Sequence, residues 1–252
     1  MKTFSEYKSN LNNIRESVIP QYTLFPKSKT ALKKMINEEI KKHGYNADLN
    51  HIDVSKITDL SGLFMKSKFN GDISKWDVSN VTNMFAMFCK SEFDGDISDW
   101  DVSNVTNMGC MFSQATSFNQ DLSGWDVSNV TNMEDMFYEV RTFNGDVSTW
   151  DVRKVENMHG MFAFSAFNGN LKRWNTKNVT DMHYMFAYCK SFNQDISRWD
   201  VSNVTDMRNM FTRCESFNQD ISRWDVSNVK DRSNMFERCP CPEEYRPKFT
   251  KN

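Results

Sequence analysis

The sequence predicts an α/β repeat solenoid, because one phrase of sequence recurs at a nearly fixed period. All seven tryptophans occupy the same place in successive copies, and neighbouring tryptophans lie 24 or 25 residues apart. Columns of Met, Phe, Ile and Val recur at fixed distances from each tryptophan. Such a period is typical of solenoids, in which each copy stacks on the previous one and buries its apolar side there. The seven are Trp76, Trp100, Trp125, Trp150, Trp174, Trp199 and Trp224.

Residues 1–27 precede the repeats. A weak helical periodicity from Leu11 to Val18 is followed by Pro20 and Pro26. Because proline ends or interrupts a helix, we expect a short helix and then a linker in this segment.

The next segment, residues 28–48, predicts a capping helix. Ser28 or Thr30 can accept hydrogen bonds from the free N–H groups of the first turn, and Gly44 ends the helix. The terminal unit of a solenoid has to cover an open apolar end, so we expect the helix to lie against the first coil. Its predicted apolar face consists of Leu32, Met35, Ile36 and Ile40.

Residues 49–239 form the predicted solenoid of eight coils. The first coil starts at Leu49 and lacks a tryptophan, whereas each later coil starts three residues before its tryptophan. The last coil has Arg232 where a buried methionine is expected, and we therefore place the end of the stack there. Residues 240–252 begin with a proline and are expected to be a tail.

Two apolar periods follow each other within a coil. Trp100 and Val102 alternate with polar residues, as in a half-buried strand. The apolar residues that follow are spaced as on one face of a helix. Each coil is therefore predicted to contribute a short parallel strand, about 4.8 Å from the next, and a short helix. The helical positions of this coil are Val105, Met108, Met111 and Phe112.

The wording of the repeats resembles that of a known family. The spacing Ile97-x-x-Trp100-x-Val102-x-x-Val105 matches the L-x-x-L-x-L pattern of leucine-rich repeats, and the phrase Trp-Asp-Val-Ser-Asn-Val-Thr and the Met-Phe pairs recur with it. Over residues 49–239 the chain resembles the BspA-like leucine-rich repeat family. The resemblance implies a leucine-rich-repeat-like solenoid, and its members are mostly described as bacterial surface or adhesion proteins or as uncharacterised. The chain departs from the surface-protein pattern, because no export signal or anchor is recognised.

Composition and charge argue against several classes of function. The 252 residues have a formal net charge of −2, so no overall positive field would attract nucleic acid. No secretory signal or membrane-spanning run is recognised. We expect a cytoplasmic protein without membrane insertion, and the family resemblance leaves a surface location open.

One cysteine column runs through the later coils. Cys189, Cys214 and Cys239 lie 25 residues apart, and we assign Ala115, Val140 and Phe164 to the same column in earlier coils. A column that accepts these residues predicts buried thiols, because free cysteine behaves as a small hydrophobe. A ladder of disulfides or of metal sites is the alternative.

The remaining inventory does not suggest an enzyme. His159 and His183 share a column, but further metal ligands are not evident, and we expect solvated surface histidines. No Gly-rich phosphate loop or nucleophile elbow is present. We therefore expect no catalytic residue, no metal and no cofactor.

An aspartate column follows the tryptophans. Stacked like charges repel, so either each carboxylate accepts hydrogen bonds from nearby N–H or Ser hydroxyl groups, or the column is an acidic groove for cations or a basic segment. The column consists of Asp53, Asp77, Asp101, Asp126, Asp151, Asn175, Asp200 and Asp225.

Basic residues interrupt this lattice near Trp174, and we take the interruption as the candidate binding site. Arginine is favoured at binding hot spots, although these side chains could instead neutralise neighbouring aspartates. A partner could instead use the variable wall, which we define as the outer helical positions that vary freely between coils, such as Glu134-Asp135, His159-Gly160, His183-Tyr184 and Arg208-Asn209. The candidate binding residues are Arg153, Arg173, Asn175, Lys177, Arg198, Arg223, Asp151 and Asp200.

The predicted function is a non-enzymatic repeat scaffold that binds an unidentified protein through its extended strand face. A surface or virion structural or adhesion component is the alternative. The sequence does not identify the partner or the oligomeric state.

Overall fold

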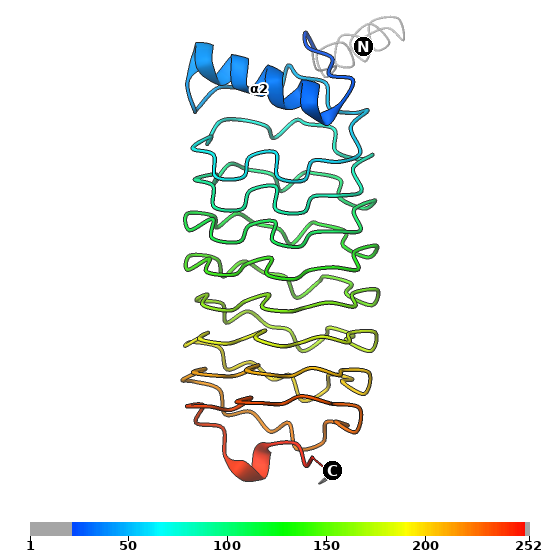
Figure 1. Ribbon diagram of the computed structural model, residues 1–252, viewed down its shortest axis with the longest axis vertical. Coiled ribbons are helices and arrows are strands. Elements are labelled where there is room, and N and C mark those ends of the chain that lie inside the picture. The colour runs from blue at the N-terminus through cyan, green and yellow to red at the C-terminus, as the bar shows by residue number, and fades with distance from the viewer. Residues whose placement is uncertain (1–21, 250–252) are drawn as a thin grey trace, which may run out of the picture.

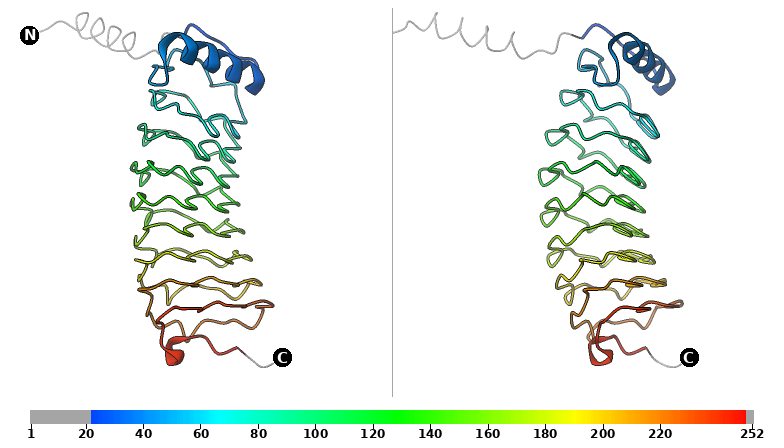
Figure 2. Two further views of the ribbon diagram at one scale, coloured as in Figure 1. Left: turned by 60° about the vertical axis from the view of Figure 1, so that its left-hand side comes forward. Right: turned by 90° about the vertical axis from the view of Figure 1, so that its left-hand side faces the viewer.

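The computed structural model describes residues 22–249, and the helix expected near the N-terminus lies outside this range. Figures 1 and 2 show an elongated stack of flattened coils, with a helix across its first end and a short helical turn at its last end. The coils follow one another in sequence order, so each contacts mainly its neighbours. The chain is therefore a repeat protein in structure as well as in sequence.

Helix α2 (Lys29–His43) lies across the N-terminal end of the stack. The Ser28 hydroxyl accepts a hydrogen bond from the Ala31 N–H, and Gly44 ends the helix with a φ of 85°, as expected for a helix C-cap glycine. Leu32 and Ile36 are buried in the same core as the first coils. The helix thus covers apolar side chains that would otherwise face water.

Residues 22–27, expected to be a linker, pair with the first coil. Leu24 forms a parallel bridge with Ile52, and its carbonyl accepts a hydrogen bond from the Asp53 N–H. Residues 22–27 therefore extend the stack by one hydrogen-bonded backbone segment beside the first coil.

The prediction of a short helix in each coil is wrong. Within residues 22–249 the helices are α2 and the 3-10 helix η1 (Glu243–Tyr245), and neither belongs to a repeated coil. The N–H groups of Met108, Cys110 and Phe112 donate to carbonyls of the next coil instead of to residues four positions earlier. An α-helix needs those same donors within its own segment, so stacking and helix formation exclude each other here.

The segment forms β-turns instead. Met111 N–H donates to the Met108 carbonyl, and Ser113 N–H donates to the Cys110 carbonyl. Cys110 and Gln114 have positive φ values of 55° and 58°, and the same two columns have positive φ in the other coils. A turn with positive φ at its third residue returns its first and fourth side chains to the same side. This is why the methionines keep an inward spacing of three without a helix.

The prediction of a strand around each tryptophan is also wrong. Between coils, the described residues form isolated parallel bridges and no continuous strand. The repeated bridges lie at a later column than the tryptophans, where Asn107 pairs with Asn83 and with Asn132. The eight members of this column are Asp59, Asn83, Asn107, Asn132, Asn157, Asp181, Asp206 and Asp231.

The tryptophan column forms the centre of the core. Every indole N–H donates to a backbone carbonyl of the preceding coil at 2.9–3.2 Å, as Trp100 does to Ile73. Ring centroids of successive tryptophans such as Trp76 and Trp100 lie 6.4 Å apart with nearly parallel planes. Phenylalanine columns stack beside them, so each coil is fixed both by packing and by a buried hydrogen bond.

Cys189, Cys214 and Cys239 are buried free thiols. Burial raises the pKa of Cys189 to about 12, which disfavours the nucleophilic thiolate. One assignment in this column needs correction. Ser165 occupies the position given to Phe164, because its N–H donates to Phe162 as Cys189 N–H donates to Phe186.

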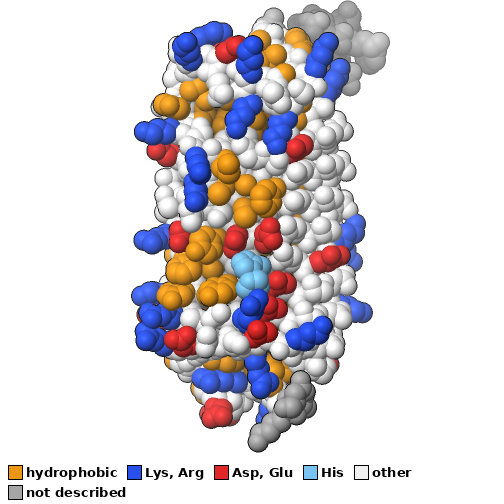
Figure 3. Space-filling model, viewed as in Figure 1, with side chains coloured by type: hydrophobic (Ala, Val, Ile, Leu, Met, Phe, Trp, Pro, Cys, Tyr) orange, Lys and Arg blue, Asp and Glu red, His pale blue; other side chains and the backbone are white. Residues whose placement is uncertain are grey.

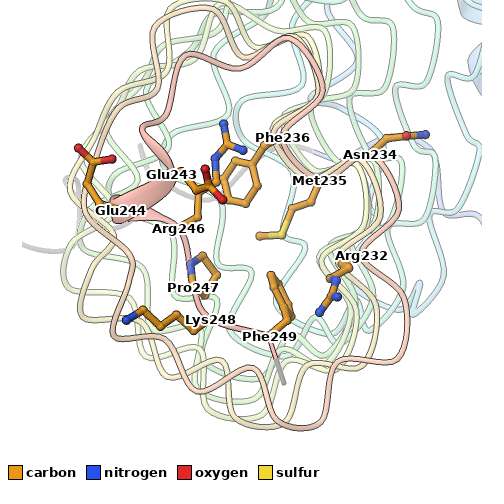
Figure 4. Close-up of a pocket in the computed structure, with 10 residues that line it drawn as sticks. All are labelled: Arg232, Asn234, Met235, Phe236, Glu243, Glu244, Arg246, Pro247, Lys248 and Phe249. Atoms are coloured by element: carbon orange, nitrogen blue, oxygen red, sulfur yellow. The ribbon is translucent and has the colours of Figure 1, made fainter. Parts of the chain in front are cut away.

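The tail folds back over the last coil instead of leaving the stack. The guanidinium of Arg232 lies 4.2 Å from the centre of the Phe249 ring, and that of Arg246 lies 4.8 Å from the centre of Phe236. Figure 4 shows Met235, Phe236 and Phe249 facing the hollow between the last coil and the tail. Both ends of the stack are therefore covered, the first by α2 and the last by the tail.

Candidate functional site

The aspartate column after the tryptophans is a hydrogen-bonded turn element. Each of its members accepts a hydrogen bond from the backbone N–H two residues later, at 3.0–3.2 Å. Ser hydroxyls add a second bond in several coils, as from Ser202 to Asp200 at 2.6 Å. Of the two explanations offered by the sequence, hydrogen bonding to nearby N–H and Ser groups is therefore confirmed.

At two members of the column, these hydrogen bonds favour the ionised carboxylate. Hydrogen bonds from the Ser103 hydroxyl and backbone N–H hold the pKa of Asp101 below its usual value. Hydrogen bonds from Ser227 do the same for the pKa of Asp225. In both residues one carboxylate oxygen closes a turn.

Arg153 is engaged within its own coil. Its guanidinium donates to both oxygens of Asp151, at 2.8 Å from Nε and 2.6 Å from the terminal nitrogen. This two-point ion pair lowers the pKa of Asp151. For Arg153 the neutralising interpretation is the one that the structure supports.

Three other arginines are arranged differently. Arg173, Arg198 and Arg223 each precede a tryptophan and are exposed on successive coils. Among residues 22–249 they have no ion pair closer than 4.0 Å, in contrast to Arg153 and Lys172. We call these three side chains the arginine row. The row places three unpaired guanidinium groups one coil apart along the stack.

The coil that starts the row departs from the others in its core. Thr176 replaces the usual buried valine, and its hydroxyl donates to the Asp200 carbonyl at 2.8 Å. Asn175 replaces the aspartate, and its side chain accepts from the Lys177 N–H at 3.2 Å. The turn geometry is thus retained while one negative charge is lost and the positive Lys177 is added.

The variable wall, which consists of turns and not of helices, holds a second cluster. Figure 3 shows it as histidines beside several acidic side chains. The Nδ1 atoms of His159 and His183 lie 3.1 Å apart, and His183 Nδ1 lies 2.6 Å from Asp181 Oδ1. These three residues could hold a metal ion, because their ligand atoms lie within 4.8 Å of one another. The sequence comparison of columns missed Asp181, which is two residues before His183 and belongs to the neighbouring column.

Asp135, which the sequence assigned to the variable wall without a role, also faces this cluster. Its Oδ1 is the one buried side-chain oxygen or nitrogen without a hydrogen-bond partner in the described part of the chain. Burial raises the pKa of Asp135, and His159 opposes the shift. His159 Nε2 lies 3.6 Å from this oxygen.

Aromatic side chains form a further surface feature that column comparison did not single out. Phe164 and Tyr188 stack with ring centroids 4.3 Å apart, and Tyr138 meets Phe164 edge-on. The Arg213 guanidinium lies 5.3 Å from the centre of Tyr188. Phe164 and Tyr188 occupy the same column, and the sequence could have shown this pairing. The assignment of Phe164 to the cysteine column concealed it.

Comparison with known proteins gives a family without a known activity. The model of the family described as "Mycoplasma protein of unknown function, DUF285" matches residues 30–149, 81–171 and 136–245, which together cover most of the chain. A search of curated proteins found no match. Within residues 22–249, no helix has the length and apolar character needed to cross a membrane.

Proposed function

The chain belongs to this family of unknown function, and we propose that it is a non-enzymatic repeat scaffold that binds a protein partner. The proposal includes the class of fold, a solenoid related to the BspA-like leucine-rich repeats. The 24- or 25-residue period and the stacked coils support that class. The absence of coil helices means that the relationship is in the repeat pattern and not in every element.

The observation that carries the proposal is the arginine row. Arg173, Arg198 and Arg223 are exposed, whereas Arg153 is held by Asp151. Guanidinium groups that are not held in a close ion pair can make two-point hydrogen bonds to carboxylates of a partner, which lysines cannot match in geometry. The row therefore favours an acidic segment of a protein over a neutral one.

The spacing of the row favours an extended segment. The tryptophans that directly follow these arginines have ring centroids 6.3 and 6.4 Å apart, so successive arginines are separated by about one such step. An extended chain brings alternate side chains to one face about every 7 Å, so two carboxylates at positions i and i+2 would reach the row. The other candidate binding residues would then border the contact, namely Arg153, Asp151, Asp200, Asn175 and Lys177.

Affinity capture from a lysate of the source cells tests this role. We expect the tagged wild-type protein to retain a specific partner, and the variant Arg173→Asp/Arg198→Asp to lose it. Aspartate already occupies this column at Asp99, so the variant should fold. Lys75→Asp in the same column, outside the row, is the matched control and should retain the partner.

Two outcomes contradict the proposal in different ways. Equal retention by the wild type and the double variant would exclude the arginine row as the contact. No specific partner for the wild type would favour the structural or adhesion role instead.

A further inference from the structure

His159 and His183 lie close enough for their Nδ1 atoms to share a proton or a metal ion. The rings lie in neighbouring coils with centroids 3.7 Å apart, at an angle of 86°. The two Nδ1 atoms are 3.1 Å apart, and Asp181 Oδ1 lies 2.6 Å from His183 Nδ1. Two imidazole nitrogens this close require either a proton between them or a metal ion, because facing lone pairs repel.

We propose that His159, Asp181 and His183 bind one divalent transition-metal ion, for which Zn²⁺ is the probe. Imidazole and carboxylate donors together suit Zn²⁺, Co²⁺ and Ni²⁺, whereas Mg²⁺ and Ca²⁺ prefer oxygen ligands alone. The protein supplies three ligands, which leaves a fourth position for water or a group of a partner.

The ligand spacing fits such an ion. With Zn–N bonds of about 2.0–2.1 Å, two nitrogen ligands lie about 3.4 Å apart in a tetrahedron and about 3.0 Å apart in an octahedron. The observed separation of 3.1 Å falls between these values. Asp181 Oδ1, at 2.6 Å from His183 Nδ1, has to withdraw by a few tenths of an ångström.

Asp206 does not complete the set, although its Oδ2 lies 3.9 Å from His183 Nδ1. The Arg208 guanidinium already pairs with this carboxylate at 2.7 Å. Arg208 occupies the column of the two histidines in the following coil, so the cluster ends there.

Asp135 acts as a positioning residue for His159. A metal ion on Nδ1 fixes the proton of His159 on Nε2, which faces the unpaired Asp135 Oδ1 at 3.6 Å. Hydrogen bonding of a metal-bound histidine to a carboxylate orients the ring and raises its basicity. Metal binding would thus provide the partner that this buried oxygen lacks.

Gly160 makes room for that carboxylate. A Cβ atom at residue 160 would collide with Asp135 Oδ1, whereas the φ of 56° does not itself require glycine, because the column has positive φ in every coil. The same column holds side chains in most other coils, such as Cys110 and Tyr184. The glycine therefore stands where the cluster needs space.

Titration calorimetry of the full chain with Zn²⁺ tests the site. We expect the wild type to bind one ion per chain, and His159→Ser/His183→Ser to lose this binding. Serine occupies the histidine column at Ser61 and Ser233, and asparagine occupies the Asp181 column at Asn157, so these replacements suit the turns. Asp181→Asn should weaken binding at least 10-fold, and Asp135→Asn should weaken it about 10–100-fold.

Two matched variants separate this site from other donors. His43 and His51 both approach Glu39, at 3.5 and 3.6 Å, and replacing both with alanine should leave Zn²⁺ binding unchanged. Cys89 and Cys110 are the least buried thiols, and replacing both with serine should also leave it unchanged. Co²⁺ spectra should show d–d bands without the near-ultraviolet band of a thiolate ligand.

The proposal is overturned if His159→Ser/His183→Ser binds Zn²⁺ with the affinity of the wild type while retaining its circular dichroism. It is equally overturned if binding follows the cysteine replacements. The proposal also fails if the wild type shows no saturable Zn²⁺ binding, in which case the histidines share only a proton. None of these results depends on a protein partner, so the site can fail or hold independently of the arginine row.

Discussion

Replacing one interior tryptophan tests the stacked core most directly. Trp100 is 3% exposed, its ring stacks on Trp76, and its indole N–H donates to the Ile73 carbonyl at 3.1 Å. Trp100→Ala leaves a large cavity between two coils, which costs about 3–5 kcal/mol. The lost hydrogen bond adds little beyond this, about 1 kcal/mol, because the Ile73 carbonyl still accepts the Trp76 N–H.

Trp100→Phe separates the two contributions. Phenylalanine keeps much of the ring and removes the N–H donor, so we expect a loss of about 1–2 kcal/mol. Urea unfolding followed by circular dichroism gives the free energy of unfolding from the midpoint, provided that the slope is unchanged. A loss below about 1 kcal/mol for Trp100→Ala would refute a close-packed tryptophan column.

A changed slope would mean that the coils no longer unfold together. In a stack each unit is stabilised by its neighbours, so a defect in the middle can separate the two halves. Limited proteolysis would then cut near residue 100 in the variant and not in the wild type.

Three further predictions concern the ends and the charges. Ser28→Ala removes the cap of α2 and should lower the free energy of unfolding by about 1 kcal/mol in thermal melts, whereas Ser28→Asp should not. Phe249→Ala removes the ring that packs on Arg232 and the last coil, and should increase hydrogen exchange in that coil while leaving exchange in the first coils unchanged. Hydrogen bonds from Lys172 and then from Ser197 lower the pKa of Asp195 from 3.8 to about 2. A carboxyl group whose folded pKa is depressed stabilises the fold above its unfolded pKa, and this contribution is lost between pH 4 and pH 2. Chemical unfolding across that range should show a smaller loss for Lys172→Met than for the wild type, and equal losses would contradict the assigned ion pair.

The amino-acid sequence by itself determined the repeat, the inward columns and the first cap. Trp100, Val102 and Met108 are buried as their spacing predicts, and Ser28 and Gly44 bound α2 as expected. These features are local or periodic, so they can be read from residue type and spacing. The hydrogen bonds of the aspartate column are also local, since donor and acceptor lie two residues apart.

Only the tertiary structure decided the form of the coils and the composition of the clusters. Apolar residues three positions apart suit both a helix and a turn. Which one forms depends on whether an N–H such as that of Cys110 donates to a carbonyl of the next coil. Asp135 and Asp181 reach the histidines from other columns, and Phe249 reaches Arg232 from beyond the repeats. Such contacts join residues that periodicity does not relate, because they depend on how neighbouring coils are aligned and how the tail folds back.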